Sequence, residues 1–152
     1  MSQPQAATDH DGSGRVLVGV DGSESSIRAL RWAARQAGFM GAALEVVTVW
    51  TFPEHAAPLG IVPHVPWPEE LLVVAQDELD ELVDRVLPER DPHRVHAHVI
   101  RGSAAPVLLE AAQDADLLVV GSRGRGTFAE LFLGSVSERC MRHAKCPVVV
   151  VP

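Results

Sequence analysis

Apolar positions along the chain follow two different periodicities, and each change between them marks the border of a predicted element. Short runs rich in Val, Ile and Leu are typical of buried strands, and they fall at residues 16–20, 44–50, 95–100, 116–120 and 147–151. Between these runs, apolar residues recur every three or four positions, as in helices that bury one face. Such helices are predicted at residues 27–37, 71–86, 104–112 and 135–143.

This alternation also predicts the arrangement of the sheet. Strands that are apolar throughout are usually buried on both faces, and strands separated by helices pair in parallel through right-handed crossovers. We therefore expect a single doubly wound α/β domain, with a five-stranded parallel sheet and helices on both faces. In such folds ligands bind at the carboxyl ends of the strands, near the point where the strand order reverses.

Two segments do not fit the repeat. Residues 1–14 are polar and rich in Gly, Ser, Gln and Asp, so we expect a flexible leader before a domain of residues 15–152. Residues 51–68 hold five prolines, too many for a helix, and predict a long loop. Loops of this length either cover a site or serve as plain connections, and the sequence leaves both alternatives open.

Composition and charge narrow the class of protein. The 152 residues fit one domain, and the net charge of −7 argues against nucleic-acid binding, which depends on Lys and Arg neutralising phosphates. No apolar run reaches the roughly 18–20 residues of a membrane span, and no basic segment precedes an apolar one at the N-terminus. We expect a cytoplasmic protein that binds neither membranes nor nucleic acid. Cys140 and Cys146 match no redox or metal motif and are expected to be reduced packing residues.

The strongest chemical signal is a glycine-rich segment directly after the fourth predicted strand. Gly121-Ser122-Arg123-Gly124 is followed, nine residues later, by Gly134-Ser135 at the start of a predicted helix. Glycines let the backbone approach phosphate oxygens, and a helix start offers unpaired N–H groups with a partial positive charge. The alternative is structural: the glycines shape a turn, and Ser135 caps the helix with Glu138 in a capping box.

The spacing Gly121-x2-Gly124-x9-Gly134-Ser135 is similar to the ATP-binding motif of the universal stress protein family. Two other segments resemble the family as well: Val18 to Ser23 its first strand and turn, and His143 to Val148 the entry into its last strand. The resemblance extends over nearly the whole chain. It implies strand order 3-2-1-4-5, ATP as the ligand, with Mg²⁺ as a further candidate, and a homodimer formed through the C-terminal strand.

The same resemblance implies a role for individual residues. Asp21 is expected to contact the nucleoside or a phosphate-bound metal, whereas its structural alternative is to cap the following helix. The adenine is expected near Val49, at the end of the second strand, and Gly19 belongs to the matching first strand. The phosphates and the ribose are expected to meet the residues of the motif, which are Gly121, Gly124, Gly134, Ser135, Val136 and Ser137.

Other candidates rest on weaker patterns. Arg123 and Arg125 flank the glycines and either complement a triphosphate or are simply solvated. Gly102 either borders the adenine or makes the turn before Ser103. Three histidines, and two tryptophans outside the strands, are interpreted as ordinary surface or packing residues rather than as a metal or partner site; they are His93, His96, His98, Trp32 and Trp67.

Three functions of different classes follow. The first is a regulatory stress-response module that binds ATP and presents a changed dimer surface. The second is an enzyme that hydrolyses ATP on the same scaffold, although the sequence shows no Ser/His/Asp or Cys/His arrangement for catalysis. The third is a cyclic-AMP-binding or nucleotide-free member of the family, because the motif alone does not decide the number of phosphates.

Overall fold

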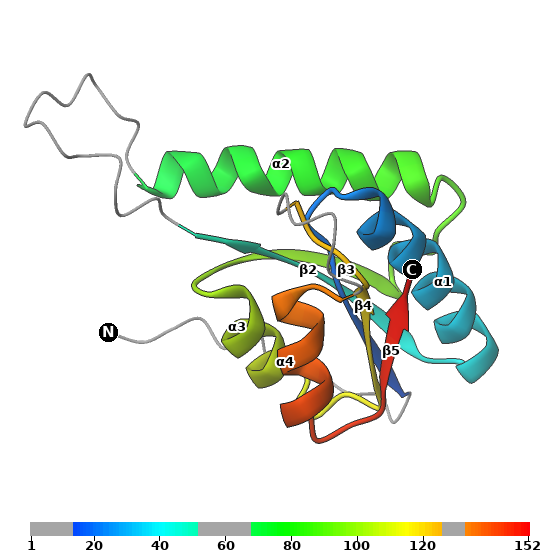
Figure 1. Ribbon diagram of the computed structural model, residues 1–152. Coiled ribbons are helices and arrows are strands. Elements are labelled where there is room, and N and C mark those ends of the chain that lie inside the picture. Colours follow the sequence, from blue (N-terminus) through cyan, green and yellow to red (C-terminus); the bar gives the residue numbers. More distant parts are fainter. Residues whose placement is uncertain (1–13, 52–67, 126–132) are drawn as a thin grey trace, which may run out of the picture.

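A computed structural model describes residues 14–51, 68–125 and 133–152 of the chain (Figure 1). The expected leader and most of the proline-rich segment 51–68 lie outside the described residues. Strands and helices alternate in the predicted order, with these bounds: β1 Arg15–Gly19, α1 Glu24–Met40, β2 Ala43–Trp50, α2 Pro68–Val86, β3 Val95–Arg101, α3 Ala104–Ala111, β4 Leu117–Gly121, α4 Ser135–His143 and β5 Val148–Val151.

The strands form one parallel sheet in the order β3-β2-β1-β4-β5, which confirms the predicted fold class and strand order. Helices α1 and α2 cover one face, and α3 and α4 cover the other (Figure 1). The strand order reverses at β1, because β2 lies on one side of it and β4 on the other. The carboxyl ends of β1 and β4 therefore form the place where this fold binds ligands.

The core has two parts, one on each face of the sheet. In β1, Val16 and Val18 pack with Leu30 of α1 on one face, while Leu17 packs with Leu108 of α3 on the other. The three β1 side chains are fully buried. Burial of β1 from both sides makes it the rigid centre of the fold, so its carboxyl end is held in a fixed position.

The helix ends differ from the sequence expectation in several places. Helix α1 continues through Gly38 and ends at Gly41, whose positive φ of 63° forms the cap. Helix α2 begins at Pro68, the last residue of the predicted loop. Proline is favoured at the first helical position, because the N–H that it lacks would have no intrahelical acceptor there. Ser103 lies at the N-cap of α3, but its side chain makes no capping hydrogen bond.

The cysteines match the expectation of reduced packing residues. Cys140 is buried against α3 and β4, Cys146 is partly buried, and both are free thiols. Burial raises the pKa of the Cys140 thiol to about 11, which keeps it protonated and unreactive at neutral pH. Among the described helices, none is long and apolar enough to cross a membrane.

One acidic residue is buried inside the sheet. Glu45 of β2 is 3% exposed, and its Oε2 lies 3.0 Å from Nε2 of His98 on β3. Burial raises the pKa of Glu45, but the His98 hydrogen bond and the charges of His98, Arg15 and His96 outweigh it, so the pKa lies below its ordinary value of 4.5. A lowered acid pKa stabilises the fold above that value, and the stabilisation is lost as the pH falls below it.

We predict that Glu45→Gln lowers the free energy of unfolding at pH 7 by about 1–2 kcal/mol, because the charge-assisted hydrogen bond to His98 is lost. The difference from the unchanged chain should shrink toward zero as the pH falls through the lowered pKa of Glu45, because the carboxyl is then itself protonated. Urea unfolding at several pH values measures both effects. Glu110→Gln is the control, since this exposed side chain makes no ion pair within the described ranges. A constant difference across the pH range would contradict the assignment.

Candidate functional site

A cavity of about 470 Å³ opens at the carboxyl ends of β1 and β4. Its walls come from the turn after β1, the loop after β4 and the start of α4. Gly102 does not line it, but every other expected ligand contact does. These lining residues are Gly19, Asp21, Val49, Gly121, Arg123, Gly124, Gly134, Ser135, Val136 and Ser137.

Asp21 connects two loops that are far apart in the sequence. Its Oδ1 accepts hydrogen bonds from the backbone N–H of Ser23 at 2.9 Å and from the Ser23 hydroxyl at 2.5 Å. Its Oδ2 accepts from the backbone N–H of Arg125, in the loop after β4, at 3.1 Å. The N-cap of α1 is Ser23, so helix capping by Asp21, the structural alternative, is wrong.

The protonation state of Asp21 follows from these contacts. Burial raises its pKa, but the hydrogen bonds from Ser23, with those involving Ser26 and the Arg125 N–H, outweigh burial and lower the pKa below its ordinary value. The carboxylate is therefore ionised at neutral pH. A negative charge at the wall of the cavity repels phosphate unless a cation lies between them.

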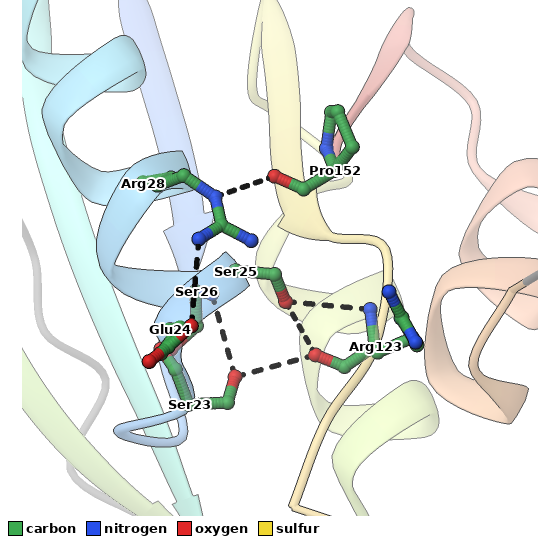
Figure 2. A network of polar contacts seen from close by, with 7 residues as sticks. All are labelled: Ser23, Glu24, Ser25, Ser26, Arg28, Arg123 and Pro152. Carbon is green, nitrogen blue, oxygen red and sulfur yellow. Dashed lines mark hydrogen bonds and ion pairs between the residues drawn. The ribbon is translucent and has the colours of Figure 1, made fainter. Parts of the chain in front are cut away.

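The first turn of α1 holds the loop after β4 (Figure 2). The Ser25 hydroxyl donates to the carbonyl of Arg123 at 2.5 Å and accepts from the Arg123 N–H at 3.3 Å. The Ser23 hydroxyl lies 3.2 Å from the same carbonyl. Because Ser25 is 6% exposed, this contact is shielded from water and fixes the backbone of the glycine-rich loop.

Two glycines of the loop lie against this turn. A Cβ added to Gly121 would be 2.8 Å from the backbone nitrogen of Ser26, so a side chain would push α1 away from β4. A Cβ added to Gly124 would be 2.7 Å from Oδ2 of Asp21. Glycine is required by the close approach of the α1 backbone at Gly121 and of the Asp21 carboxylate at Gly124, and neither glycine has a positive φ.

Helix α4 begins inside the cavity. The Gly134 N–H donates to the carbonyl of Ser122 at 2.6 Å, and the buried Ser137 hydroxyl donates to the carbonyl of Gly121 at 2.6 Å. Gly134 is the N-cap and Ser135 is the first helical residue, so the capping-box alternative for Ser135 is wrong. The first N–H groups of a helix have no intrahelical acceptor and carry a partial positive charge, and here they belong to residues that line the cavity.

The other side of the cavity is apolar. Val47 and Val49 of β2 and Leu108 of α3 line it, forming a surface that suits the flat face of a purine. Gly102 instead makes the turn after β3, which was the alternative interpretation. It has a φ of 149°, its N–H donates to the carbonyl of Trp50 at 3.0 Å, and its own carbonyl accepts from the Thr51 hydroxyl at 2.9 Å.

The remaining candidates have separate places. The Arg125 guanidinium lies close to Gly22, since a Cβ there would be 2.6 Å from its Nη2, whereas the Arg123 side chain is exposed at the cavity. Trp32 is partly buried against the core, and Trp67 lies outside the described residues. No group of three or more metal-ligating side chains occurs in the described part of the chain, and His98 pairs with Glu45.

Sequence reasoning missed Ser25, which holds the loop, the cavity-lining Ser26 and the apolar wall from α3. Ser25 and Ser26 appear only as polar residues in the first turn of a helix, and Leu108 only as a core position. The one available signal was the run Ser23 to Ser26, which is rich in hydroxyl groups and follows directly on Asp21-Gly22. Such a run at a helix start beside a ligand site is a source of loop-holding hydrogen bonds.

The sequence profile of the universal stress protein family matches residues 12–152. The chain belongs to this family. A universal stress protein of Mycobacterium tuberculosis is 36% identical over 143 residues, which cover 90% of this chain and 46% of that protein. The chain thus spans about half the length of this curated relative.

Two solved structures share the fold. The universal stress protein UspA from Lactobacillus plantarum has a TM-score of 0.71 at 20% identity, covering 92% of this chain and 98% of that one. A universal stress protein in complex with cAMP is 30% identical, with a TM-score of 0.62 and coverage of 91% and 96%. The first comparison supports the fold of this family member, and the second shows that a relative with this fold binds a nucleotide.

We predict that Ser25→Ala destabilises the protein by about 1–3 kcal/mol, because the Arg123 peptide loses its partner in a buried setting. Exchange of the Arg123 amide hydrogen should become faster than that of amides in the centre of β1. Ser103→Ala is the matched control: it replaces a serine at a helix N-cap whose side chain makes no capping bond, so we expect a change within about 0.5 kcal/mol. Equal effects of the two substitutions would show that the Ser25 contact holds nothing.

Proposed function

We propose that this chain is a cytoplasmic, ATP-binding universal stress protein that works as a homodimeric regulatory module. The observation that carries the proposal is the start of α4, which opens into the cavity beside the glycine-rich loop. Phosphates bind readily at such helix starts, because open N–H groups and the helix dipole both favour negative charge. A cavity of about 470 Å³ also lies within the usual size range of small-molecule sites.

The proposed pose follows the chemistry of the walls. The adenine lies against the apolar side at Val49, and the ribose lies near Gly19 and Gly121, where the strands end. The phosphates then extend toward the positive end of α4. The residues assigned to the phosphates are Gly124, Gly134, Ser135, Val136 and Ser137, with Arg123 at the open side.

Magnesium fits this site only together with a nucleotide. Asp21 is an ionised oxygen ligand of the kind that Mg²⁺ prefers, but the described residues offer no cluster of three ligating side chains. Phosphate oxygens and water would have to supply the other ligands. Bound in this way, the ion neutralises charge between Asp21 and the phosphates.

Cyclic AMP is the second candidate ligand, because the relative solved with cAMP is 30% identical to this chain. Its single phosphate is esterified twice and carries one charge. It cannot reach both the ribose side and the α4 start, whereas the terminal phosphates of ATP can. Thermal stability in the presence of each ligand separates the two, and measurement of released ADP tests for slow ATP hydrolysis.

We predict that ATP at a hundredfold excess over its dissociation constant raises the melting temperature by roughly 5–11 °C, which corresponds to about 2.7 kcal/mol of linkage free energy. Cyclic AMP should raise it less. GTP should also raise the melting temperature less than ATP does, because guanine reverses the donor and acceptor pattern of adenine. The measurement is a thermal melt with and without Mg²⁺. A cAMP shift equal to or above that of ATP would reverse the ligand assignment, and no shift with any nucleotide would favour a nucleotide-free member.

A substitution at the start of α4 tests the phosphate site directly. Ser135 is exposed, lines the cavity and is the first residue of the helix. Ser135→Glu should leave the fold intact, since an acidic residue at a helix start is favourable, but it should weaken ATP binding about tenfold or more by repulsion. Ser135→Gln has nearly the same size without the charge and should bind ATP more tightly than Ser135→Glu. Equal affinities in calorimetry would place the phosphates elsewhere.

The homodimer rests on the edge of the sheet. Among the described strands, β5 lies at the edge of the sheet and pairs only with β4, so its other edge can pair with a second copy. The curated relative of which this chain covers 46% has room for a second unit of this size, and two copies of this chain would reach a similar length. Pairing of identical edges gives a closed, symmetric dimer.

We predict that Val150→Pro converts the dimer to a monomer. The carbonyls of Pro147 and Val151 both accept from the β4 side, so by strand alternation the N–H of Val150 points to the free edge. Proline removes that N–H and leaves the ladder with β4 in place. Val149→Pro is the control, because its N–H faces β4 and its loss should damage the fold. Sedimentation equilibrium measures the mass, and an unchanged dimer in Val150→Pro would mean that another surface forms it.

A further inference from the structure

A second cavity, of about 650 Å³, lies at the opposite end of the sheet from the nucleotide cavity. One wall is the second half of α1, and the other is the segment of residues 86–94 that connects α2 to β3. We call it the α1 groove. Its floor is made of apolar side chains that come from both walls and from the first residues of β2 and β3, namely Ala34, Ala37, Ala42, Leu44, Val86, Leu87 and Val95.

The rim of the α1 groove is rich in arginine. Arg31 and Arg35 stand on α1, and Arg90 and Arg94 stand on the opposite wall. Of the chain's 13 basic residues, these four gather around one opening in a protein of net charge −7. Two acidic residues, at positions 89 and 91, also belong to the rim, so an excess of positive charge remains.

The arginines of the two walls differ in their contacts with the rest of the protein. Arg90 pairs with Asp84, and Nη1 of Arg94 donates to the carbonyl of Gly41 at 3.1 Å, so both are held by the protein. Arg31 and Arg35 are exposed and make no hydrogen bond or ion pair within residues 14–51, 68–125 and 133–152.

Arg28, about one turn before Arg31 on α1, has partners within the protein. Arg28 forms an ion pair with Glu24 at 3.8 Å and donates from Nε to the carbonyl of Pro152 at 2.6 Å (Figure 2). Arg31 and Arg35 lie four residues apart on one face, a like-charge pair that costs a helix a few tenths of a kcal/mol. An anion placed between them would remove that repulsion, and the apolar floor beside them would bury its body.

We propose that the α1 groove binds a small organic anion with an apolar body, an alkyl or aryl carboxylate. The carboxylate lies between Arg31 and Arg35, and the apolar body covers the partly exposed floor at Ala34 and Leu87. Guanidinium groups suit this role because their forked N–H donors match the two oxygens of a carboxylate. The groove lies apart from the nucleotide cavity, so this site stands or falls independently of ATP binding.

The first test compares three probes of one tail length. The full chain, labelled with ¹⁵N, is titrated with decanoate, with decyltrimethylammonium and with 1-decanol at concentrations where each stays monomeric. Decanoate should shift the amide resonances of Ala34, Leu44 and Val95 to saturation and leave those of the loop 121–124 in place. Equal binding of the cation or the alcohol would mean adhesion to apolar surface without anion recognition, and shifts confined to loop 121–124 would place the anion in the nucleotide cavity. Either result overturns the proposal.

The second test removes the charge. Arg31→Glu with Arg35→Glu should weaken decanoate binding about tenfold or more, because two charge-assisted contacts become repulsive. Arg85→Glu with Arg139→Glu changes the net charge equally at exposed arginines outside the groove, and it should bind as the unchanged chain does. Equal affinity in the two double variants overturns the proposal.

Two further outcomes would also overturn it by naming another occupant. If Arg31→Glu with Arg35→Glu changes the mass in sedimentation, a second copy of this chain covers the groove. If a peptide of alternating Glu and Leu binds the groove more tightly than decanoate in the same titration, its partner is an acidic protein segment. The spectrum of each variant shows directly whether the chain is folded.

Discussion

The cavity at the ends of β1 and β4 depends on one close contact, between the first turn of α1 and the loop that leaves β4. The two segments follow adjacent strands and meet because Gly121 has no side chain to hold them apart. Ser25 then bonds both the N–H and the carbonyl of Arg123. On the other face, a Cβ at Gly19 would be 2.8 Å from Leu108, so a second glycine lets α3 approach β1. The cavity is thus the space left where helices on both faces close on the ends of β1 and β4.

The fold could be predicted from the sequence because its signals are local. Each strand is an apolar run and each helix an apolar stripe, and these patterns survive without knowledge of the partners. The ends of the helices were harder to predict where a residue that disfavours helix lies close to the true end. Gly38 reads as a stop, yet α1 continues to Met40, because a glycine costs a helix only about 1 kcal/mol and the helix still has Gly41 to end on. Pro68 reads as loop, yet it begins α2.

The parts of the site that could not be predicted are contacts between residues far apart in the chain. The glycine-rich motif shows where a phosphate would lie, but nothing local connects Ser25 to a peptide 98 positions later. The same is true of Glu45, which lies within an apolar run and pairs with His98, two residues beyond its register partner His96 on β3. A single acid in an apolar strand, with histidines at alternate positions of the next strand, suggests an ion pair. The register of the two strands must be known before the contact can be predicted.

The cavity has negative charge at Asp21 and partial positive charge at the start of α4. This separation of charge limits how a metal can bind. The Asp21 carboxylate already accepts from Ser23 and from the Arg125 N–H, so its main task without ligand is to hold the two loops together. At the start of α4 the Gly134 N–H donates to Ser122, whereas the N–H groups of Ser135 and Val136 have no acceptor among the described residues, and in the proposed complex they receive phosphate. A metal that binds Asp21 must therefore displace or share one of these hydrogen bonds. The other described side chains of the site offer too few metal ligands to offset that loss. In the proposed complex the phosphates on α4 would supply the missing ligands, so we expect metal affinity at Asp21 to follow from nucleotide binding and not to precede it.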